Sequence, residues 1–526
     1  MLTHHVENQA TPFEDVDLFS SDLALAEALD REGAGWAVDR VRDAGVVAGS
    51  AEAVAHGRRA ERHDPRLLSH DRYGRRIDAV DYDPSWHWLL RGAVEREIHS
   101  LPWRSPQPGA HVARAALEFV WGQPNAGVMC PVSMTYSVIP ALRRDPVLAA
   151  EWEPRLTRPV YDAERPQLAG MAMTEKQGGS DVRANTTEAH PTGGDGEYEL
   201  TGHKWFCSHP SGAVFLVLAQ APGGLSCFVV ERGPGFELQR LKEKLGSRSL
   251  ASTEIEFRQA PGRVLGEEGR GVATIIEMVA HTRLDCAIGS ASSMRRGVAE
   301  AVHHARGRAA FGAPLIDQPL MLNVLADLAV ESEAATLSAL RLARAYDEDD
   351  TAFRRFATAV MKYWICKRAS AHAAEALECH GGNGYVEEGP MARLFRDAPL
   401  NGIWEGSGNV MSLDVLRAMA REPDGLAAFL AECELGRGAD GSLDAHLSSL
   451  PATLAALGDG EPQWLARRVV EDLALALQGS LVVRFSPPAV ADAFCAGRLG
   501  EGGGRAFGTL PRGLDGRAIV DRALAA

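Results

Sequence analysis

Residues 167–181 read QLAGMAMTEKQGGSD, and the character of the chain changes at this stretch. Its first half is a short apolar run and its second half is polar and rich in glycine, which is typical of a strand that ends in a loop. Short apolar or alternating runs continue to residue 257, separated by turn signals such as PTGGDG at 191–196. The stretch therefore predicts the start of an antiparallel β domain, which we place at 166–266.

Helical patterns flank the predicted β domain on both sides. Residues 1–165 have apolar residues three and four apart, as amphipathic helices do. After the β domain, patterns of the same period cover roughly 272–305, 318–346, 352–380 and 409–420, which predicts a four-helix bundle at 267–424. Residues 425–526 form an additional helical domain. The predicted fold class is α+β and mainly helical, without the strand–helix alternation of a doubly wound fold.

The composition is that of an ordinary globular protein. The 526 residues are 45% hydrophobic, and 55 Lys and Arg stand against 70 Asp and Glu, a net charge of −15. No apolar run approaches the roughly 20 residues of a membrane helix, and the N-terminus lacks the features of a secretory signal. The eight cysteines are scattered without a CxxC pair. We therefore expect a cytoplasmic protein with reduced thiols, no membrane contact and no metal site.

The densest run of basic residues lies at 58–76, which holds seven arginines. His63, Asp64 and Asp71 interrupt the run. We interpret it as a solvated, partly paired helix surface rather than as a binding patch.

Two polar segments follow predicted strands of the β domain. In MTEKQGGSD, residues 173–181, adjacent glycines let a ligand approach the backbone, and Thr174 and Ser180 offer short hydroxyls. In KWFCSHP, residues 204–210, the hydroxyl of Ser208 follows two aromatic residues and could face a planar ring. A plain polar turn and an aromatic strand end in the core are the alternatives.

Two further segments lie at predicted helix ends of the bundle. In RGRAAFG, residues 306–312, Arg308 and Phe311 are three apart and are predicted to share a helix face. The arginine could pair with a diphosphate, or form a surface salt bridge. HGGNGY, residues 380–385, follows a long helix and allows a sharp exit or a helix C-cap. A hydrolase oxyanion loop requires a G-x-S-x-G nucleophile elbow. It is excluded because the nearest match, WEGSG at 404–408, has Glu405 where the first Gly must be.

IWEGSGN, residues 403–409, precedes the last predicted helix of the bundle. Glu405 stands beside Ile403 and Trp404, so we expect apolar surroundings to raise the pKa of its carboxyl. Such a carboxylate is suited to take a proton from carbon. In the alternative interpretation Glu405 is an acid near a helix N-terminus that Ser407 or Asn409 caps.

In this order the five segments resemble the acyl-CoA dehydrogenase family of flavoproteins, over about 80–420. MTEKQGGSD is similar to the family's TEPGAGSD segment, RGRAAFG to R-x-x-F-G, and WEGSGN to its EGT segment. The extended N-terminus and the extra C-terminal domain are similar to one subgroup, the AidB-like flavoproteins of the bacterial response to DNA alkylation. That similarity covers nearly the whole chain.

The resemblance implies FAD as cofactor, an acyl-CoA or related substrate, an electron-transfer partner and a homotetramer. It implies Glu405 as the catalytic base and Arg283 as a support of the active-site loop. The implied FAD contacts are Met173, Thr174, Gly179 and Ser180 at the isoalloxazine and phosphates, Ser208 at flavin N5, Arg308 and Phe311 from a neighbouring subunit, Gly381 and Gly382 at the diphosphate, and Ser407 and Asn409 beside the catalytic loop.

The sequence departs from the family pattern at three places. The family often has a Gln eight residues after the Phe of R-x-x-F-G. Here that position is Pro319, and Gln318 stands one position earlier, which puts the adenine-side contact in doubt. Glu378 replaces a Gln near the diphosphate, so its charge is expected to point away. Ala280 stands where dehydrogenases often carry an acid, three residues before Arg283.

Two functions follow from these observations. The first is FAD-dependent α,β-dehydrogenation of an acyl-CoA thioester. The alternative is a DNA-associated flavoprotein that protects against alkylation. DNA binding requires basic groups, whereas residues 421–526 hold ten Arg, no Lys and fourteen acids, so 10 − 14 = −4. Eight arginines of this tail could still cluster in space: Arg467, Arg468, Arg484, Arg498, Arg505, Arg512, Arg517 and Arg522.

Overall fold

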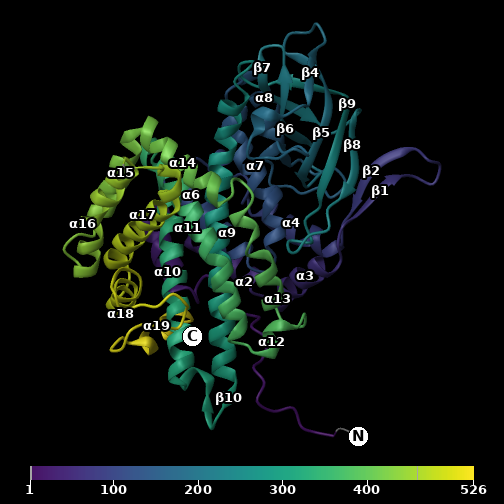
Figure 1. Cartoon of the computed structure of the whole chain (residues 1–526). Coiled ribbons are helices and arrows are strands. Elements are labelled where there is room, and N and C mark those ends of the chain that lie inside the picture. The colour runs from purple at the N-terminus through teal and green to yellow at the C-terminus, as the bar shows by residue number, and fades with distance from the viewer. Residues whose placement is uncertain (1–2, 459, 526) are drawn as a thin grey trace. The chain divides into compact units, whose positions relative to one another are not determined.

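The computed structural model describes residues 3–458 and 460–525, and Figure 1 shows their helices and strands. It forms two compact units. The sheet unit comprises Glu52–Gln107 and Pro124–Asp285, and the helical unit comprises Met1–Ala51, Pro108–Gln123 and Cys286–Ala526. The expected fold class, mainly helical with a β domain in the middle of the chain, is confirmed.

The sheet unit is built around seven strands. They are β3 (Ala169–Ala172), β4 (Glu188–Pro191), β5 (Glu197–Ser208), β6 (Val214–Ala221), β7 (Gly224–Glu231), β8 (Phe236–Leu241) and β9 (Ser252–Val264). Their order is β3-β6-β4-β5-β9-β7, with β8 paired to β9 and β6 also paired to β7. Most pairs are antiparallel, as predicted, but β3 and β4 each pair with β6 in parallel.

Strand β6 is apolar along its length because both of its faces are buried. Val214, Leu216 and Leu218 pack against α7 (Met129–Leu142) and α8 (Pro146–Leu156). Phe215 and Val217 point to a second core that lies among the strands. A strand buried on both faces reads as a continuous apolar run, and VFLVLAQ at 214–220 is such a run.

The expectation of purely helical structure before residue 165 is wrong at one place. Helices α3 (Ala51–Arg62), α4 (Pro84–Glu95) and α5 (Leu101–Arg104) are present, but β1 (Arg66–His70) and β2 (Arg76–Asp81) form a hairpin between α3 and α4. It projects from the sheet unit in Figure 1. Its tight turn forms because Asp71 accepts hydrogen bonds from the backbone N–H groups of Tyr73 and Arg75.

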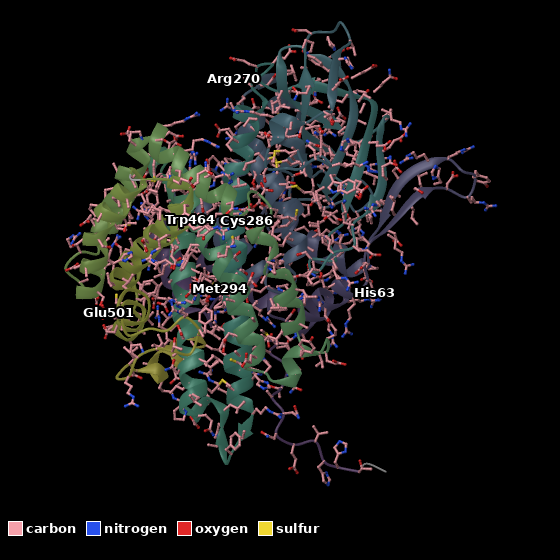
Figure 2. All side chains as sticks on the ribbon, in the orientation of Figure 1. His63, Arg270, Cys286, Met294, Trp464 and Glu501 are labelled. Carbon is pink, nitrogen blue, oxygen red and sulfur yellow. The ribbon has the colours of Figure 1, made fainter. Side chains whose placement is uncertain are left out.

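The arginines at 58–76 are therefore divided between α3 and the hairpin and do not share one helix surface. Some of these basic side chains are paired with carboxylates, as expected. Arg59 and His63 lie 3.5 and 3.3 Å from the carboxylate of Asp83, and Arg76 lies 2.8 Å from Asp78. Figure 2 marks His63 just after the end of α3.

The predicted bundle helices are present, with ends within about two residues of those expected. They are α9 (Gly271–Gly307), α10 (Pro319–Asp347), α11 (Thr351–Glu378) and α14 (Gly408–Arg421). The first turns of α9 belong to the sheet unit. The helical unit also contains α1 (Leu23–Leu29), α2 (Val38–Ala48), α6 (Ala110–Trp121), α12 (Gly382–Tyr385), α13 (Met391–Asp397), α15 (Pro423–Glu434), α16 (Gly441–Ala455), α17 (Pro462–Phe485), α18 (Pro488–Phe494) and α19 (Gly516–Ala523).

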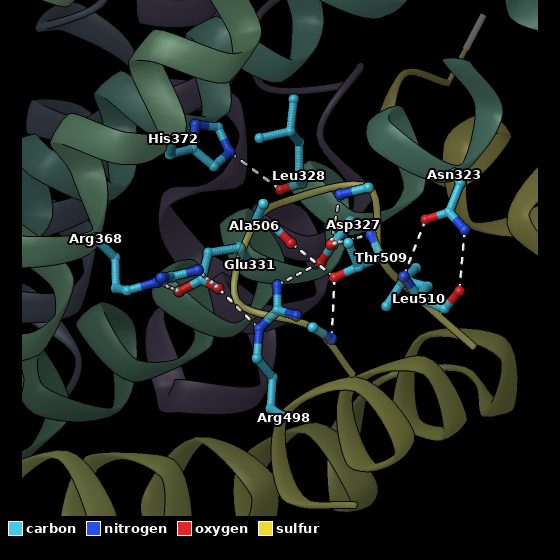
Figure 3. A network of polar contacts seen from close by, with 12 residues as sticks. Asn323, Asp327, Leu328, Glu331, Arg368, His372, Arg498, Ala506, Thr509 and Leu510 are labelled. Carbon is cyan, nitrogen blue, oxygen red and sulfur yellow. Dashed lines mark hydrogen bonds and ion pairs between the residues drawn. The ribbon is translucent and has the colours of Figure 1, made fainter. Parts of the chain in front are cut away.

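Helix α10 lies at the centre of the helical unit and contacts α6, α11, α17 and α19. Residues 325–343 of this helix are buried all round, including Asp327 and Glu331. A buried carboxylate requires a partner, because moving its charge out of water is costly. The partners come from α11 and from the C-terminal part of the chain, as Figure 3 shows.

Arg498 forms ion pairs with both Asp327 and Glu331, the second at 3.0 Å. Arg368 of α11 binds Glu331 through two nitrogen atoms, at 3.1 and 3.0 Å. Despite burial, which opposes ionisation, the two guanidinium groups lower the pKa of Glu331 to about 2. The network fastens the segment that carries Arg498 to α10 and α11 (Figure 3).

Candidate functional site

The two polar segments predicted in the β domain lie side by side in the sheet unit. The backbone N–H of Trp205 donates to the carbonyl of Thr174 at 2.8 Å. This bond is available because the pairing of β5 with β9 shifts register between Lys204 and Cys207, which frees the N–H of Trp205 from the ladder. Thr174, in the loop after β3, and Ser208, at the end of β5, thus belong to segments that lie side by side.

The glycines of the first segment are needed for its close packing. A Cβ atom at Gly179 would lie 2.4 Å from the hydroxyl oxygen of Thr174. Gly178 has φ +142°, and a Cβ there would meet nothing within 4 Å, so its outer face is open. Met173, Thr174 and Ser208 are half-buried, whereas Gly179 and Ser180 are exposed. A flat ring or a phosphate can therefore approach this backbone.

A buried ion pair beneath these loops was not foreseen from the sequence. Lys204 Nζ lies 2.8 Å from Glu175 Oε1, and neither side chain is exposed to solvent. One signal could have pointed to it. Lys204 lies four residues after Leu200 on the same inward face of β5, where a lysine needs a counter-charge.

The segment with Glu405 lies in the helical unit and is held by a buried lysine. Lys362 of α11, only 1% exposed, donates hydrogen bonds to the carbonyls of Trp404, at 2.8 Å, and Gly406. These are the carbonyls on either side of Glu405, which has φ +57°. That conformation costs about 1–3 kcal/mol in a residue other than glycine, so the surrounding contacts must stabilise it.

Further contacts fix the same segment. The indole N–H of Trp404 donates to Asn401 Oδ1 at 2.8 Å, and the amide of Asn401 donates to Ser290 Oγ at 3.1 Å. Lys362, Asn401 and Ser290 lie far from one another in the sequence and belong to no motif. Sequence reasoning therefore missed them.

The surroundings of Glu405 differ in part from those expected. Glu405 and Trp404 are half-buried, but Ile403 is 63% exposed in the single chain. The capping interpretation receives no support. Ser407 occupies the N-cap position of α14 without a side-chain capping bond, and Asn409 instead accepts a hydrogen bond from Arg467 at 2.9 Å.

Arg308 and Phe311 do not share a helix face, which corrects the expectation. Helix α9 ends at Gly307, and β10 (Ala309–Ala310) and β11 (Ala313–Pro314) form a two-residue hairpin. Phe311 and Gly312 occupy its turn with φ of +52° and +83°. Positive φ at both central residues is the geometry that suits a tight hairpin. The Phe311 side chain at the tip is 100% exposed.

The N-terminal segment joins this hairpin to the glycine turn after α11. The Arg308 guanidinium donates to the carbonyl of Asn8 at 2.8 Å, and the Asn8 side chain bonds both backbone groups of Ala309. Asn383 lies 3.4 Å from Gln9. Gly381, with φ +58°, and Gly382 are exposed, and a Cβ at either would meet nothing within 4 Å. The turn is open to a ligand.

The remaining predicted positions have distinct surroundings. Gln318 donates to the carbonyl of Ala310 at 3.0 Å, so its amide supports the hairpin. Glu378 is exposed at the end of α11, and Arg283 is half-buried on the part of α9 that belongs to the sheet unit.

Comparison with known proteins explains this combination of loops. Models of the acyl-CoA dehydrogenase middle domain and C-terminal domain match residues 170–260 and 269–420. A model of the N-terminal domain of the adaptive response protein AidB matches residues 8–163. A protein of Escherichia coli (strain K12) that bears the name "Putative acyl-CoA dehydrogenase AidB" is 42% identical over 522 residues, which cover 95% of each chain. The chain belongs to the acyl-CoA dehydrogenase family. It is an FAD-dependent oxidoreductase acting on CH–CH bonds.

Further comparisons extend the match to solved structures. Acyl-CoA dehydrogenase family member 11 of Caenorhabditis elegans is 33% identical over 404 residues, 71% of this chain and 65% of that protein. The solved structure of C. elegans ACDH-11 in complex with C11-CoA has a TM-score of 0.87 at 26% identity, covering 99% of this chain and 97% of that one. The apo-form of Bd2924 has a TM-score of 0.84 at 29% identity, covering 91% and 99%.

Most of the tail arginines are paired within the helical unit, which does not favour the free basic surface that the DNA hypothesis requires. Six of the eight bind partners within the helical unit: Arg467 binds Asn409, Arg468 binds Asp472, Arg484 binds Glu432, Arg498 binds Asp327 and Glu331, Arg517 binds Asp317, and Arg522 binds Glu27 and Glu333. Most of these partners are carboxylates, so the guanidinium charges serve internal ion pairs.

Within residues 3–458 and 460–525, no helix is long and apolar enough to cross a membrane.

Proposed function

We propose that the protein catalyses α,β-dehydrogenation of an acyl-CoA thioester with Glu405 as the base. One observation carries the proposal: buried Lys362 holds the two carbonyls that flank Glu405 and so fixes the carboxylate in a strained backbone conformation. Strain of this kind is typical of functional positions. A solved relative with C11-CoA bound supports an acyl-CoA as the ligand.

The residues present fit FAD. Gly178, Gly381 and Gly382 leave their backbone open; the segment of Gly178 also contains Met173, Thr174, Gly179 and Ser180, and β5, which ends at Ser208, is hydrogen-bonded to it. These residues, with Ser407 and Asn409, would hold the cofactor, and Arg308 and Phe311 would reach it from a neighbouring subunit. FAD, when bound, accepts the hydride that leaves the β-carbon of the acyl chain.

The part of Glu405 is to remove the α-proton. An α-proton of a thioester is weakly acidic, so the base must be fixed at it before the reaction. Lys362 and Trp404 supply that fixation by holding the backbone on both sides.

The direct test is Glu405→Gln. Glutamine has nearly the same shape, so the fold and FAD content should be unchanged. We expect the rate of flavin reduction by the best acyl-CoA, measured by anaerobic stopped flow, to fall by more than the roughly 10²–10⁴-fold typical of a general base. Glu434→Gln, in the exposed Glu434–Arg437 pair of α15, is the control and should reduce at the wild-type rate. Equal rates in Glu405→Gln and wild type would falsify the proposed mechanism.

Assembly and cellular setting complete the proposal. We infer a homotetramer, because the fully exposed Phe311 lies on a projecting hairpin that fits the family's contact with a neighbouring FAD. An electron-transfer protein would reoxidise the cofactor. The eight cysteines, all within the described part of the chain, are free thiols, which supports a reducing cytoplasmic compartment. The purified protein should be yellow and release its FAD on denaturation.

A further inference from the structure

The two loops proposed to contact the flavin are joined beneath their surface at three successive positions. The carbonyl of Thr174 accepts from the N–H of Trp205 at 2.8 Å. The carboxylate of Glu175 binds the ammonium of Lys204 at 2.8 Å. These two links run in antiparallel sense, and a third continues the series, because the N–H of Lys176 donates to Nε2 of His203 at 3.0 Å.

The central link is the one that solvent cannot reach. Glu175 and Lys204 are both 0% exposed. Both members of the pair also make further hydrogen bonds. Glu175 accepts from the backbone N–H of Thr186 at 2.7 Å and of Thr187 at 3.1 Å, and Lys204 donates to the carbonyl of Leu218 at 2.7 Å. The pair therefore connects the first loop, the entry to β4, β5 and β6.

The charges on the pair are maintained by each other. Burial opposes ionisation of Glu175, but Lys204 and the threonine hydrogen bonds lower the pKa of its carboxyl to about 2. Burial lowers the pKa of Lys204 to about 8, and Glu175 opposes that change. Both groups are therefore charged at neutral pH. An ion pair in a low-dielectric interior has a narrow range of favourable geometry, whereas an apolar contact is non-directional.

We propose that Glu175 and Lys204 are positioning residues that hold the Thr174 and Ser208 loops in fixed register for the flavin. The inference rests on the proposed function, because it takes these loops as flavin contacts. Thr174 directly precedes Glu175, and Ser208 ends β5 four residues after Lys204, where it pairs with Ser252 of β9, so the ion pair acts most directly on Thr174. Neither charged group reaches the surface on which the flavin would lie.

The test separates positioning from stability with three variants: Lys204→Met, Glu175→Gln and the double variant. Lys204→Met alone leaves Glu175 as an uncompensated buried charge and should lower the thermal midpoint strongly. The double variant buries no net charge, and its glutamine still accepts from Thr186 or Thr187. Its midpoint should therefore recover most of that loss, while the link between the loops stays broken.

Two measurements follow loop register rather than stability. Hydrogen exchange of the apo-protein, read on peptides covering 173–181 and 203–209, should be at least about tenfold faster in the double variant, while β7 is unchanged. The dissociation constant for FAD should rise at least about tenfold, and the visible circular dichroism of bound FAD should change. Arg76→Met/Asp78→Asn is the matched control, because it removes an ion pair of the same unit far from both loops in sequence. It should change neither measurement.

A double variant with wild-type exchange, FAD affinity and dichroism would show that the pair only stabilises the fold, and would overturn the inference. Should Lys204→Met or the double variant not fold, Thr186→Ala removes only the hydroxyl bond to Glu175 and should still raise exchange of 173–181 two- to threefold. Unchanged exchange there also contradicts the inference. Failure of the wild-type protein to bind FAD would refute the proposed function, whereas the apo-protein exchange still decides the positioning role.

Discussion

At the scale of single residues, buried charges hold the two candidate loops. Lys204 fixes a loop in the sheet unit through a carboxylate, and Lys362 fixes the Glu405 loop in the helical unit through two carbonyls. In both cases an ammonium group far from water holds backbone that would otherwise be free to move. Ammonium donors suit this task, because one group can satisfy several acceptors.

Lys362→Met should slow the proposed reaction without changing the base itself. Loss of both hydrogen bonds lets the strained backbone at Glu405 relax, and a misplacement of about 1 Å can cost roughly 100-fold in rate. Stopped-flow reduction by acyl-CoA measures the effect, with FAD content as the check that the cofactor is retained. Lys367→Met, an exposed lysine on the same helix, is the control. Identical rates for both variants would show that the two hydrogen bonds are dispensable.

The ionisation of Glu331 should make the free energy of unfolding depend on pH. Its pKa is lowered from 4.5 to about 2 in the folded protein, so the unfolded chain binds the proton more tightly. The contribution of about 3 kcal/mol is complete above pH 4.5 and is lost as the pH falls through 2. Urea unfolding between pH 6 and pH 3 tests this. Glu331→Gln should weaken the dependence on pH, and an unchanged slope argues against the ion network as its source.

At the scale of elements, the β10–β11 hairpin and the N-terminal segment form one structural group. The hairpin itself is short and exposed, and Asn8 holds its first strand through the backbone of Ala309. An isolated two-stranded hairpin is only marginally stable in water. The N-terminal segment therefore supports the hairpin that would carry Arg308 and Phe311 to a neighbouring subunit.

Arg308→Ala should release FAD and weaken the oligomer together, if the guanidinium contacts a neighbouring FAD. Asn8→Ala is the matched control, because it removes the support of the hairpin but keeps the guanidinium. We expect a smaller loss of FAD in Asn8→Ala than in Arg308→Ala. Light scattering combined with flavin absorbance measures both effects. An Arg308→Ala protein that keeps its FAD and its mass contradicts the expected contact.

At the scale of the whole molecule, internal ion pairs fasten the C-terminal domain. The chain carries an excess of fifteen negative charges, yet Arg484, Arg498 and Arg522 of its tail bind buried or half-buried carboxylates of α10 and α15. The tail therefore contributes to the stability of the bundle.

Arg498→Met should lower the free energy of unfolding by about 3–5 kcal/mol, because Asp327 and Glu331 each lose a buried partner. Arg437→Met is the control, since Arg437 forms an ion pair with Glu434 on the exposed surface and should shift the urea midpoint little. Equal midpoints in the two variants would show that the network in Figure 3 does not hold the domain.

The sequence alone determined the fold class, the four bundle helices and the family. Each of these depends on local pattern: the apolar period, the turn residues and the spacing of motifs such as MTEKQGGSD and IWEGSGN. It also located the candidate base, because Glu405 stands inside such a motif. Local patterns predict the structure correctly where near neighbours in the chain decide each residue's environment.

Only the tertiary structure decided which residues hold these motifs in place. Lys362 lies far before Glu405 in the sequence, and Glu175, in the loop after β3, meets Lys204 of β5. The hairpin at 309–314 likewise appeared as a helix end in the sequence, because Arg308 and Phe311 fit a helical spacing. The physical reason is common to all three. Burial and long-range hydrogen bonds depend on which distant segments pack together, and local patterns in a single sequence do not identify those segments.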